Sequence, residues 1–146
     1  MPDLIGIPPG AVGELWAKQA ITEALHRYCH GLDRFDRVQA DIWHPGGTAS
    51  YGGIFEGTGA GFLDWVWPVH ETFERTSHQV TNILITVDGD RATSETYVTV
   101  CLRGADVDIT DRGRYSDTWS FRDGRWAIDA RTFTGDIQQI TPRGAQ

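Results

Sequence analysis

The chain has 146 residues, 40% of them hydrophobic, which is enough to build one domain with a proper core. Its formal net charge of −7 argues against a nucleic acid partner, because phosphate binding needs a positive field. The sequence has no apolar run of the roughly 18 residues that a membrane-spanning helix needs, so we expect no membrane partner either.

The N-terminal stretch and the cysteines bear on the cellular compartment. The segment MPDLIGIPPGAVGEL lacks the basic start and the long apolar core of a signal peptide. Cys29 and Cys101 lie far apart, without the spacing of a metal site, and both sit in apolar patterns. We therefore predict a cytoplasmic protein with two free thiols that pack in its core.

The first third of the chain has mainly helical patterns. Residues 1–11 are rich in proline and glycine and predict an extended arm. In the next segment, apolar residues recur every three or four positions and predict one face of a helix: Leu15, Trp16, Ala20, Ile21, Ala24, Leu25 and Tyr28. A second, short helical pattern includes Val38, Ile42 and Trp43, and the residues HPGG at 44–47 are expected to end it.

A hairpin and a further helix follow. Alternating residues at 48–51 and 54–57 predict two strands joined by a turn at Gly52 and Gly53. Residues 60–74 then predict a helix with Pro68 inside it. A proline at an interior position should kink or divide this helix.

The second half of the chain predicts antiparallel strands. They cover residues 80–87, 92–102, 114–121 and 126–133, with tight turns at 88–90 and 122–124. Strict alternation in the last strand places Asp129 and Arg131 together on one face and Ile128 on the opposite face.

Helices that precede a run of hairpin-linked strands predict an α+β fold. We expect a curved antiparallel sheet packed against about three helices around an internal pocket for a small ligand. The predicted domain covers residues 12–137, after the arm at 1–11 and before a C-terminal tail at 138–146.

Three ionisable residues stand out as candidates for chemistry. Arg131 is either a strand-edge cation paired with a surface acid or a pocket cation that stabilises negative charge. His78 is either a solvated residue at a strand start or a general base. The second possibility needs a carboxylate that orients the imidazole, and Asp33 at the end of the first helix is a candidate.

The other histidines and the known motifs are less informative. His30 could enter the pocket because it lies three residues before Asp33, and His70 is expected to be half exposed. No HxH, HExxH or CxxC spacing favours a metal. No GxSxG, GxGxxG after a strand or P-loop occurs, so we predict no cofactor and no nucleophilic catalysis.

Several aromatic residues fall where the helices meet the first strands. Trp43, Tyr51, Trp65 and Trp67 could line a pocket that suits a flat or apolar substrate, and Tyr28 and Tyr51 could donate hydrogen bonds to a substrate oxygen. Core packing is the alternative for each of them.

Four segments carry a resemblance to a known family: ITEALHRYCHGLDRFD, IWHPGGTASYGG, SHQVTNILITVDGDRATSETYV and GRYSDTWSFRDGRWAIDAR. Over residues 12–135 the chain resembles the SnoaL-like branch of the nuclear transport factor 2-like superfamily. Within that branch it is most similar to scytalone dehydratase and hexachlorocyclohexane dehydrochlorinase. The resemblance implies the cone-shaped fold of this superfamily.

The resemblance also implies roles for individual residues. Asp33 would orient His78, which would be the general base, and Arg131 would stabilise the leaving group. Trp43 would be a pocket wall. The dehydrochlorinase has a lysine where this chain has Tyr28, and a phenol suits an oxygenated substrate better than a departing chloride.

Together these observations predict a cofactor-independent lyase. His78, held by Asp33, would remove a proton from a small aromatic or polycyclic substrate, and water or a small fragment such as an aldehyde would leave. The pocket residues would be Tyr28, His30, Trp43, Tyr51 and Trp67. The alternatives are an isomerase or cyclase with the same base, and a non-catalytic ligand-binding module. By resemblance we expect a homo-oligomer, with a trimer favoured over a dimer.

Overall fold

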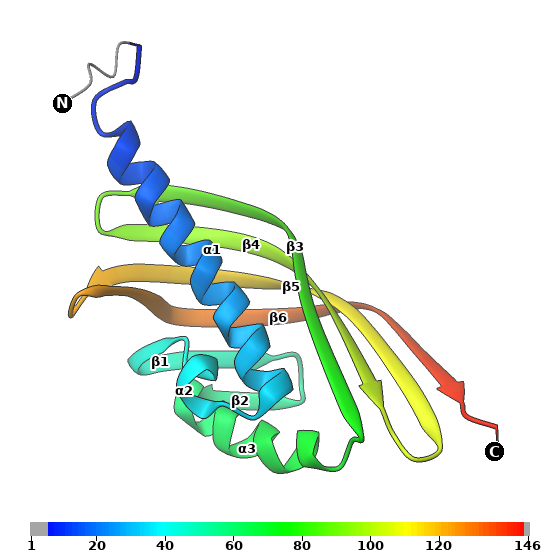
Figure 1. The fold of residues 1–146 in the computed structure, drawn as a ribbon. Coiled ribbons are helices and arrows are strands. Elements are labelled where there is room, and N and C mark those ends of the chain that lie inside the picture. The colour runs from blue at the N-terminus through cyan, green and yellow to red at the C-terminus, as the bar shows by residue number, and fades with distance from the viewer. Residues whose placement is uncertain (1–5, 145–146) are drawn as a thin grey trace.

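The computed structural model describes residues 6–144 and has the predicted α+β architecture, with three helices on one face of a curved, open sheet (Figure 1). Residues 1–5 of the predicted arm and 145–146 of the predicted tail lie outside the described residues. None of the helices within residues 6–144 is long and apolar enough to cross a membrane. The elements are α1 (Ala11–Arg34), α2 (Arg37–Ala40), β1 (Trp43–Tyr51), β2 (Phe55–Thr58), α3 (Gly59–Glu71), β3 (Arg75–Asp88), β4 (Arg91–Arg103), β5 (Val107–Arg122) and β6 (Arg125–Pro142).

The sheet has six strands in the order β2-β1-β6-β5-β4-β3. Neighbouring strands are antiparallel, except for β1 and β6, which are parallel. The last strand of the chain, β6, lies inside the sheet between β1 and β5. Strands β3 to β6 are longer than their sequence patterns predicted, and β6 includes residues 138–142 of the predicted tail. The ends of β5 and β6 near the C-terminus extend beyond the helices (Figure 1).

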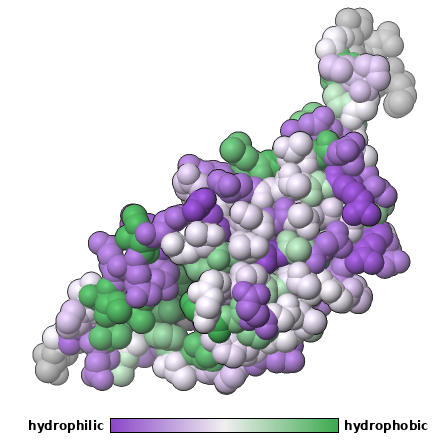
Figure 2. All heavy atoms as spheres, turned by 180° about the vertical axis from the view of Figure 1, so that it is seen from behind, coloured by the Kyte–Doolittle hydropathy of each residue, from purple (hydrophilic) through white to green (hydrophobic). Residues whose placement is uncertain are grey.

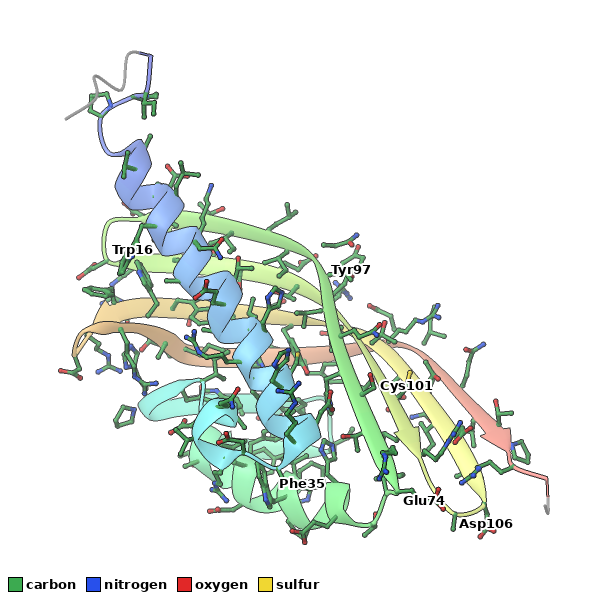
Figure 3. The ribbon with its side chains drawn as sticks, in the orientation of Figure 1. Trp16, Phe35, Glu74, Tyr97, Cys101 and Asp106 are labelled. Carbon is green, nitrogen blue, oxygen red and sulfur yellow. The ribbon has the colours of Figure 1, made fainter. Side chains whose placement is uncertain are left out.

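Helix α1 packs a stripe of residues against the sheet, but the stripe begins later than its sequence pattern indicates. Ala17, Ile21 and Leu25 are buried, whereas Leu15 is 64% exposed and Trp16 is 57% exposed. The prediction that these two residues belong to the buried face was wrong. The first turns of α1 run past the edge of the sheet (Figures 1 and 3), and Trp16 is covered only in part, by an edge-on contact with Phe121 at 5.6 Å between ring centroids.

The junction of α1 and α2 depends on a glycine and an aspartate. A Cβ atom on Gly31 would lie 2.3 Å from the backbone nitrogen of Ala40, so only glycine permits this approach of the two helices. Asp36 caps α2 by accepting hydrogen bonds from the backbone N–H groups of Val38 and Gln39, at 3.1 and 3.2 Å. This tight turn fixes the end of α1, where Asp33 lies.

The HPGG segment does not end a helix, as its composition suggested. Trp43 begins β1, and the register between β1 and β6 shifts between Trp43 and Thr48. Gly46 adopts a φ of 79°, a conformation that favours glycine, so these residues form an irregular stretch inside a strand.

Helix α3 begins at Gly59 and is capped by Thr58, whose hydroxyl accepts a hydrogen bond from the backbone N–H of Gly61 at 3.0 Å. The helix is continuous through Pro68, so the proline does not divide it, and it ends at Glu71 rather than at residue 74. Phe73 therefore belongs to the connection to β3.

A bulge in β6 changes which residues face the core. Trp119 pairs with Ile128, but Thr118 pairs with Ala130, so Asp129 is an extra residue. An extra residue reverses the alternation beyond it, which places Arg131 on the buried side with Ile128. The predicted shared face of Asp129 and Arg131 was therefore wrong, and Asp129 instead pairs with Arg122 at the surface.

Candidate active site

A cavity of about 190 Å³ lies between α1, α3 and the inner face of the sheet. Its polar groups are two histidines, one aspartate and three tyrosines, His70, His78, Asp111, Tyr28, Tyr51 and Tyr115. The rest of the lining is apolar, with Phe62, Trp65, Phe73 and Phe133 as its aromatic members. An apolar pocket with a few polar groups is typical of a small-molecule site.

Other depressions of the surface are larger, up to about 500 Å³ for the groove beside the first turns of α1. None of the other four described depressions is lined by a histidine. We therefore place the candidate site in the smaller cavity, where the ionisable groups meet.

His78 and Asp33 lie next to each other, although 45 residues separate them. Oδ1 of Asp33 is 2.6 Å from Nδ1 of His78. The backbone N–H of His78 donates to Oδ2 of Asp33 at 2.9 Å, and the hydroxyl of Thr76 donates to Oδ1 at 3.0 Å. Since β3 is an edge strand, this N–H points away from the sheet, and the carboxylate satisfies it.

The contacts of Asp33 keep it ionised. Burial alone would raise its pKa, but the hydrogen bonds from the ring and backbone of His78 and from Thr76 outweigh burial and lower the pKa below its usual value. A carboxylate at Nδ1 fixes the ring of His78 and its tautomer, which leaves Nε2 to act on a ligand.

Besides the contact of His78 with Asp33, the cavity has a pair of tyrosine hydroxyls. The hydroxyl oxygens of Tyr28 and Tyr51 are 3.1 Å apart. Burial raises the pKa of both phenols, so both remain protonated near neutral pH. One hydroxyl proton is used within the pair, and both residues line the cavity.

Arg131 lies behind these tyrosines and does not line the cavity. Its guanidinium donates two hydrogen bonds to Asp117, at 2.8 and 2.9 Å, and both side chains are 0% exposed. It also stacks on the ring of Tyr115, 3.8 Å from the ring centroid, and lies 4.7 Å from that of Tyr28. Burial opposes its charge, but the Asp117 carboxylate outweighs burial and holds the pKa of Arg131 well above its usual value.

Three predicted pocket residues lie outside the cavity. His30 is exposed on α1. Trp43 is buried against Gly59, where an added Cβ atom would lie 2.2 Å from the indole ring. Trp67 packs on Phe35 at the end of α1, with ring centroids 5.7 Å apart, and Figure 3 labels Phe35 at that position.

Two ionisable residues of the cavity were missed or misjudged from the sequence. His70 is buried rather than half exposed, and its spacing of four residues from Val66 and eight from Phe62 was a usable signal of the buried face of α3. Asp111 shares a row of paired residues with Val100 and His78 across β5, β4 and β3. No sequence pattern marked Asp111, because its position depends on the register of two hairpins.

The two cysteines differ in their surroundings. Burial raises the pKa of Cys29 to about 12, so it remains a neutral core thiol, whereas Cys101 is exposed and not in the core as predicted. Within residues 6–144 no group of three or more histidine, cysteine or acidic side chains is arranged to hold a metal ion.

Known proteins of the same fold agree with the resemblance seen in the sequence. A candidate scytalone dehydratase from Novosphingobium aromaticivorans is 24% identical, with a TM-score of 0.78 over 86% of this chain and 88% of that chain. A hexachlorocyclohexane dehydrochlorinase, LinA type 2, is 21% identical, with a TM-score of 0.75 over 92% and 94%. A protein of unknown function from Mycobacterium tuberculosis is 26% identical, with a TM-score of 0.75 over 90% and 78%.

No significant match was found among curated proteins. The family model described as SnoaL-like domain, however, matches residues 13–132, which is most of the chain. The protein therefore belongs to the SnoaL-like domain family.

Proposed function

We propose that the protein is a cofactor-independent lyase that removes water, or a small fragment such as an aldehyde, from a small aromatic substrate. The family and the fold support catalysis of the lyase or isomerase type on a small molecule. The observation that carries the proposal is the 2.6 Å contact between His78 and Asp33 at the wall of an aromatic cavity.

In the proposed reaction His78 is the general base. It takes a proton from a carbon or hydroxyl of the substrate, and Asp33 stabilises the imidazolium that forms. A positioned base of this kind supplies on the order of 10²–10⁴ in rate.

Negative charge that develops on a substrate oxygen would be stabilised by the other hydroxyl proton of the Tyr28–Tyr51 pair. Arg131 would act through these tyrosines as a positioning residue, because its own side chain is buried behind them.

The size of the cavity limits the substrate. Pockets for drug-sized ligands measure about 300–1,000 Å³, and this cavity has about 190 Å³. We therefore propose a substrate of one or two rings rather than a larger polycyclic molecule.

A screen of hydroxylated aromatic ketones and alcohols by mass spectrometry tests the proposal. We expect the wild type to produce a compound that is lighter than its substrate by one water or one small aldehyde, and His78→Ala to produce none. Turnover by His78→Ala at the wild-type rate would contradict the proposal. A product of unchanged mass would favour the isomerase alternative, which uses the same base.

The variant must retain its fold for this comparison. Circular dichroism should be the same for His78→Ala and the wild type. His26→Gln, on the exposed side of α1, is the control for loss of a histidine and should retain full activity.

A further inference from the structure

A second imidazole, which the proposed mechanism does not yet use, lies beside His78. His70 is in the last turn of α3, and its ring centroid is 5.2 Å from that of His78, with the ring planes inclined by 41°. Both rings line the cavity. A substrate that reaches His78 therefore also lies next to His70.

The ring of His70 has an unused hydrogen-bonding atom. The residue is 7% exposed, and its Nδ1 is buried without a hydrogen-bond partner among the described residues. A buried polar atom of this kind is costly unless a ligand or an ordered water satisfies it. Nδ1 itself has almost no exposed surface, so a bound molecule would reach the ring through its other nitrogen, Nε2, which is not among the buried unpartnered atoms of the described residues.

His70 is also electrically neutral under ordinary conditions. Burial, and to a smaller extent the nearby His78, lower its pKa to about 4, although Asp33 opposes this shift. A neutral imidazole offers one N–H donor and one acceptor, and it does not compete with His78 for the substrate proton.

We propose that His70 is a second catalytic residue of this site, whose neutral ring donates a hydrogen bond to the oxygen that leaves the substrate. The inference rests on the proposed lyase function and adds a requirement to it. The leaving oxygen must lie close to the carbon that loses its proton, because the two rings are neighbours. The substrate class is then an aromatic compound with a hydroxyl group on the carbon next to that position.

The proton that His78 takes from the substrate returns to the leaving oxygen, so the step needs no other proton source. His78 takes the proton from carbon, the electron pair of the C–H bond forms the double bond, and the C–O bond breaks with its electron pair on oxygen. The imidazolium of His78 then gives its proton to that oxygen, and water leaves. His70 stays neutral throughout and stabilises the charge on the departing oxygen by its hydrogen bond.

Ligand binding tests the contact without knowledge of the natural substrate. The probes are 2-naphthol, which has a hydroxyl group, and naphthalene, which does not. We expect His70→Leu to weaken 2-naphthol about fivefold and to leave the Kd of naphthalene within twofold, as for loss of one hydrogen bond. Nitrogen NMR of the wild type should show a shift of the His70 ring resonances with 2-naphthol alone. Equal affinity of both proteins for 2-naphthol, with unmoved resonances, would overturn the proposal.

Kinetics on a substrate from the screen test the catalytic role. A contact to the leaving oxygen strengthens in the transition state, so His70→Leu should lower kcat by on the order of 10-fold to 100-fold with little change in KM. His70→Gln, which keeps a donor, should recover part of the rate, and His26→Gln should behave as the wild type. A wild-type kcat in His70→Leu, while His78→Ala is inactive, would overturn the role of His70 and leave the proposed function intact.

Discussion

Asp33 and His78 define the candidate site, and no local pattern of the sequence brings them together. The sequence offered Asp33 as a candidate to orient His78, and the family resemblance implied that the two residues meet, since neither helix nor strand periodicity relates residues 45 positions apart. Their 2.6 Å contact requires the end of α1 to lie against the edge strand β3, which is a tertiary arrangement. His70, in contrast, could have been placed from the spacing of apolar residues in α3.

The lowered pKa of His70 makes stability depend on pH. An unfolded histidine binds its proton near pH 6.5, whereas folded His70 does so only near pH 4. Between these values the unfolded state binds more protons, so the free energy of unfolding falls as the pH is lowered, by up to about 3 kcal/mol. In His70→Leu the free energy of unfolding should not show this part of its fall at low pH.

Urea unfolding at about pH 7 and about pH 4.5 measures this effect. Groups distant from His70 titrate alike in the wild type and in His70→Leu. The difference between the two proteins in the loss of unfolding free energy from about pH 7 to about pH 4.5 therefore measures the contribution of the histidine. Equal losses of stability in the two proteins would contradict the account of a neutral, buried His70.

The buried pair of Arg131 and Asp117 should matter for folding as well as for activity. Asp117→Asn leaves an uncompensated charge in the core and should destabilise the protein by about 3–5 kcal/mol. The matched control is Asp136→Asn, which removes the partner of Arg114 in an exposed pair and should cost less than about 1 kcal/mol. Similar urea midpoints for both variants would contradict this difference.

At the scale of elements, the sequence was informative about helices and turns and misleading about strand irregularities. The helices, the turn at Gly52 and Gly53 and the hairpins follow from local patterns. The bulge at Asp129 leaves no comparable pattern, yet it decides that Arg131 points into the core. A bulge depends on the pairing of two strands, so the residues of one strand do not reveal it.

The close contact of α1 and α2 gives a second test at this scale. Gly31→Ala should destabilise the protein by about 1–3 kcal/mol, because the added methyl group would meet the backbone of Ala40. Gly13→Ala makes the same change in an exposed turn of α1 with open space around it, and should stabilise by about 0.5–1 kcal/mol. Thermal unfolding distinguishes them, and a shift of the same sign in both would contradict the packing described for Gly31.

At the scale of the whole molecule, the end of the sheet that projects beyond the helices is a candidate surface for association. Ile137 and Ile140 on β6 are more than half exposed. Figure 2 shows hydrophobic side chains gathered towards the C-terminal end of the face behind α1. Where exposed apolar side chains form one large patch, they mark an interaction surface.

We predict that this surface is covered in a homotrimer, the state that the family resemblance favours. Light scattering should give three times the mass of one chain, and Ile140→Glu should reduce it. A single-chain mass for the wild type at micromolar concentration would contradict the prediction.

The central claim is that Asp33 makes His78 a general base, and one rate constant tests it most directly. Asp33→Asn keeps the size of the side chain but removes the charge that orients and stabilises the ring. On a substrate from the screen, its kcat should fall by on the order of 10²–10⁴ with an unchanged circular dichroism spectrum. A kcat within twofold of the wild type would contradict the claim.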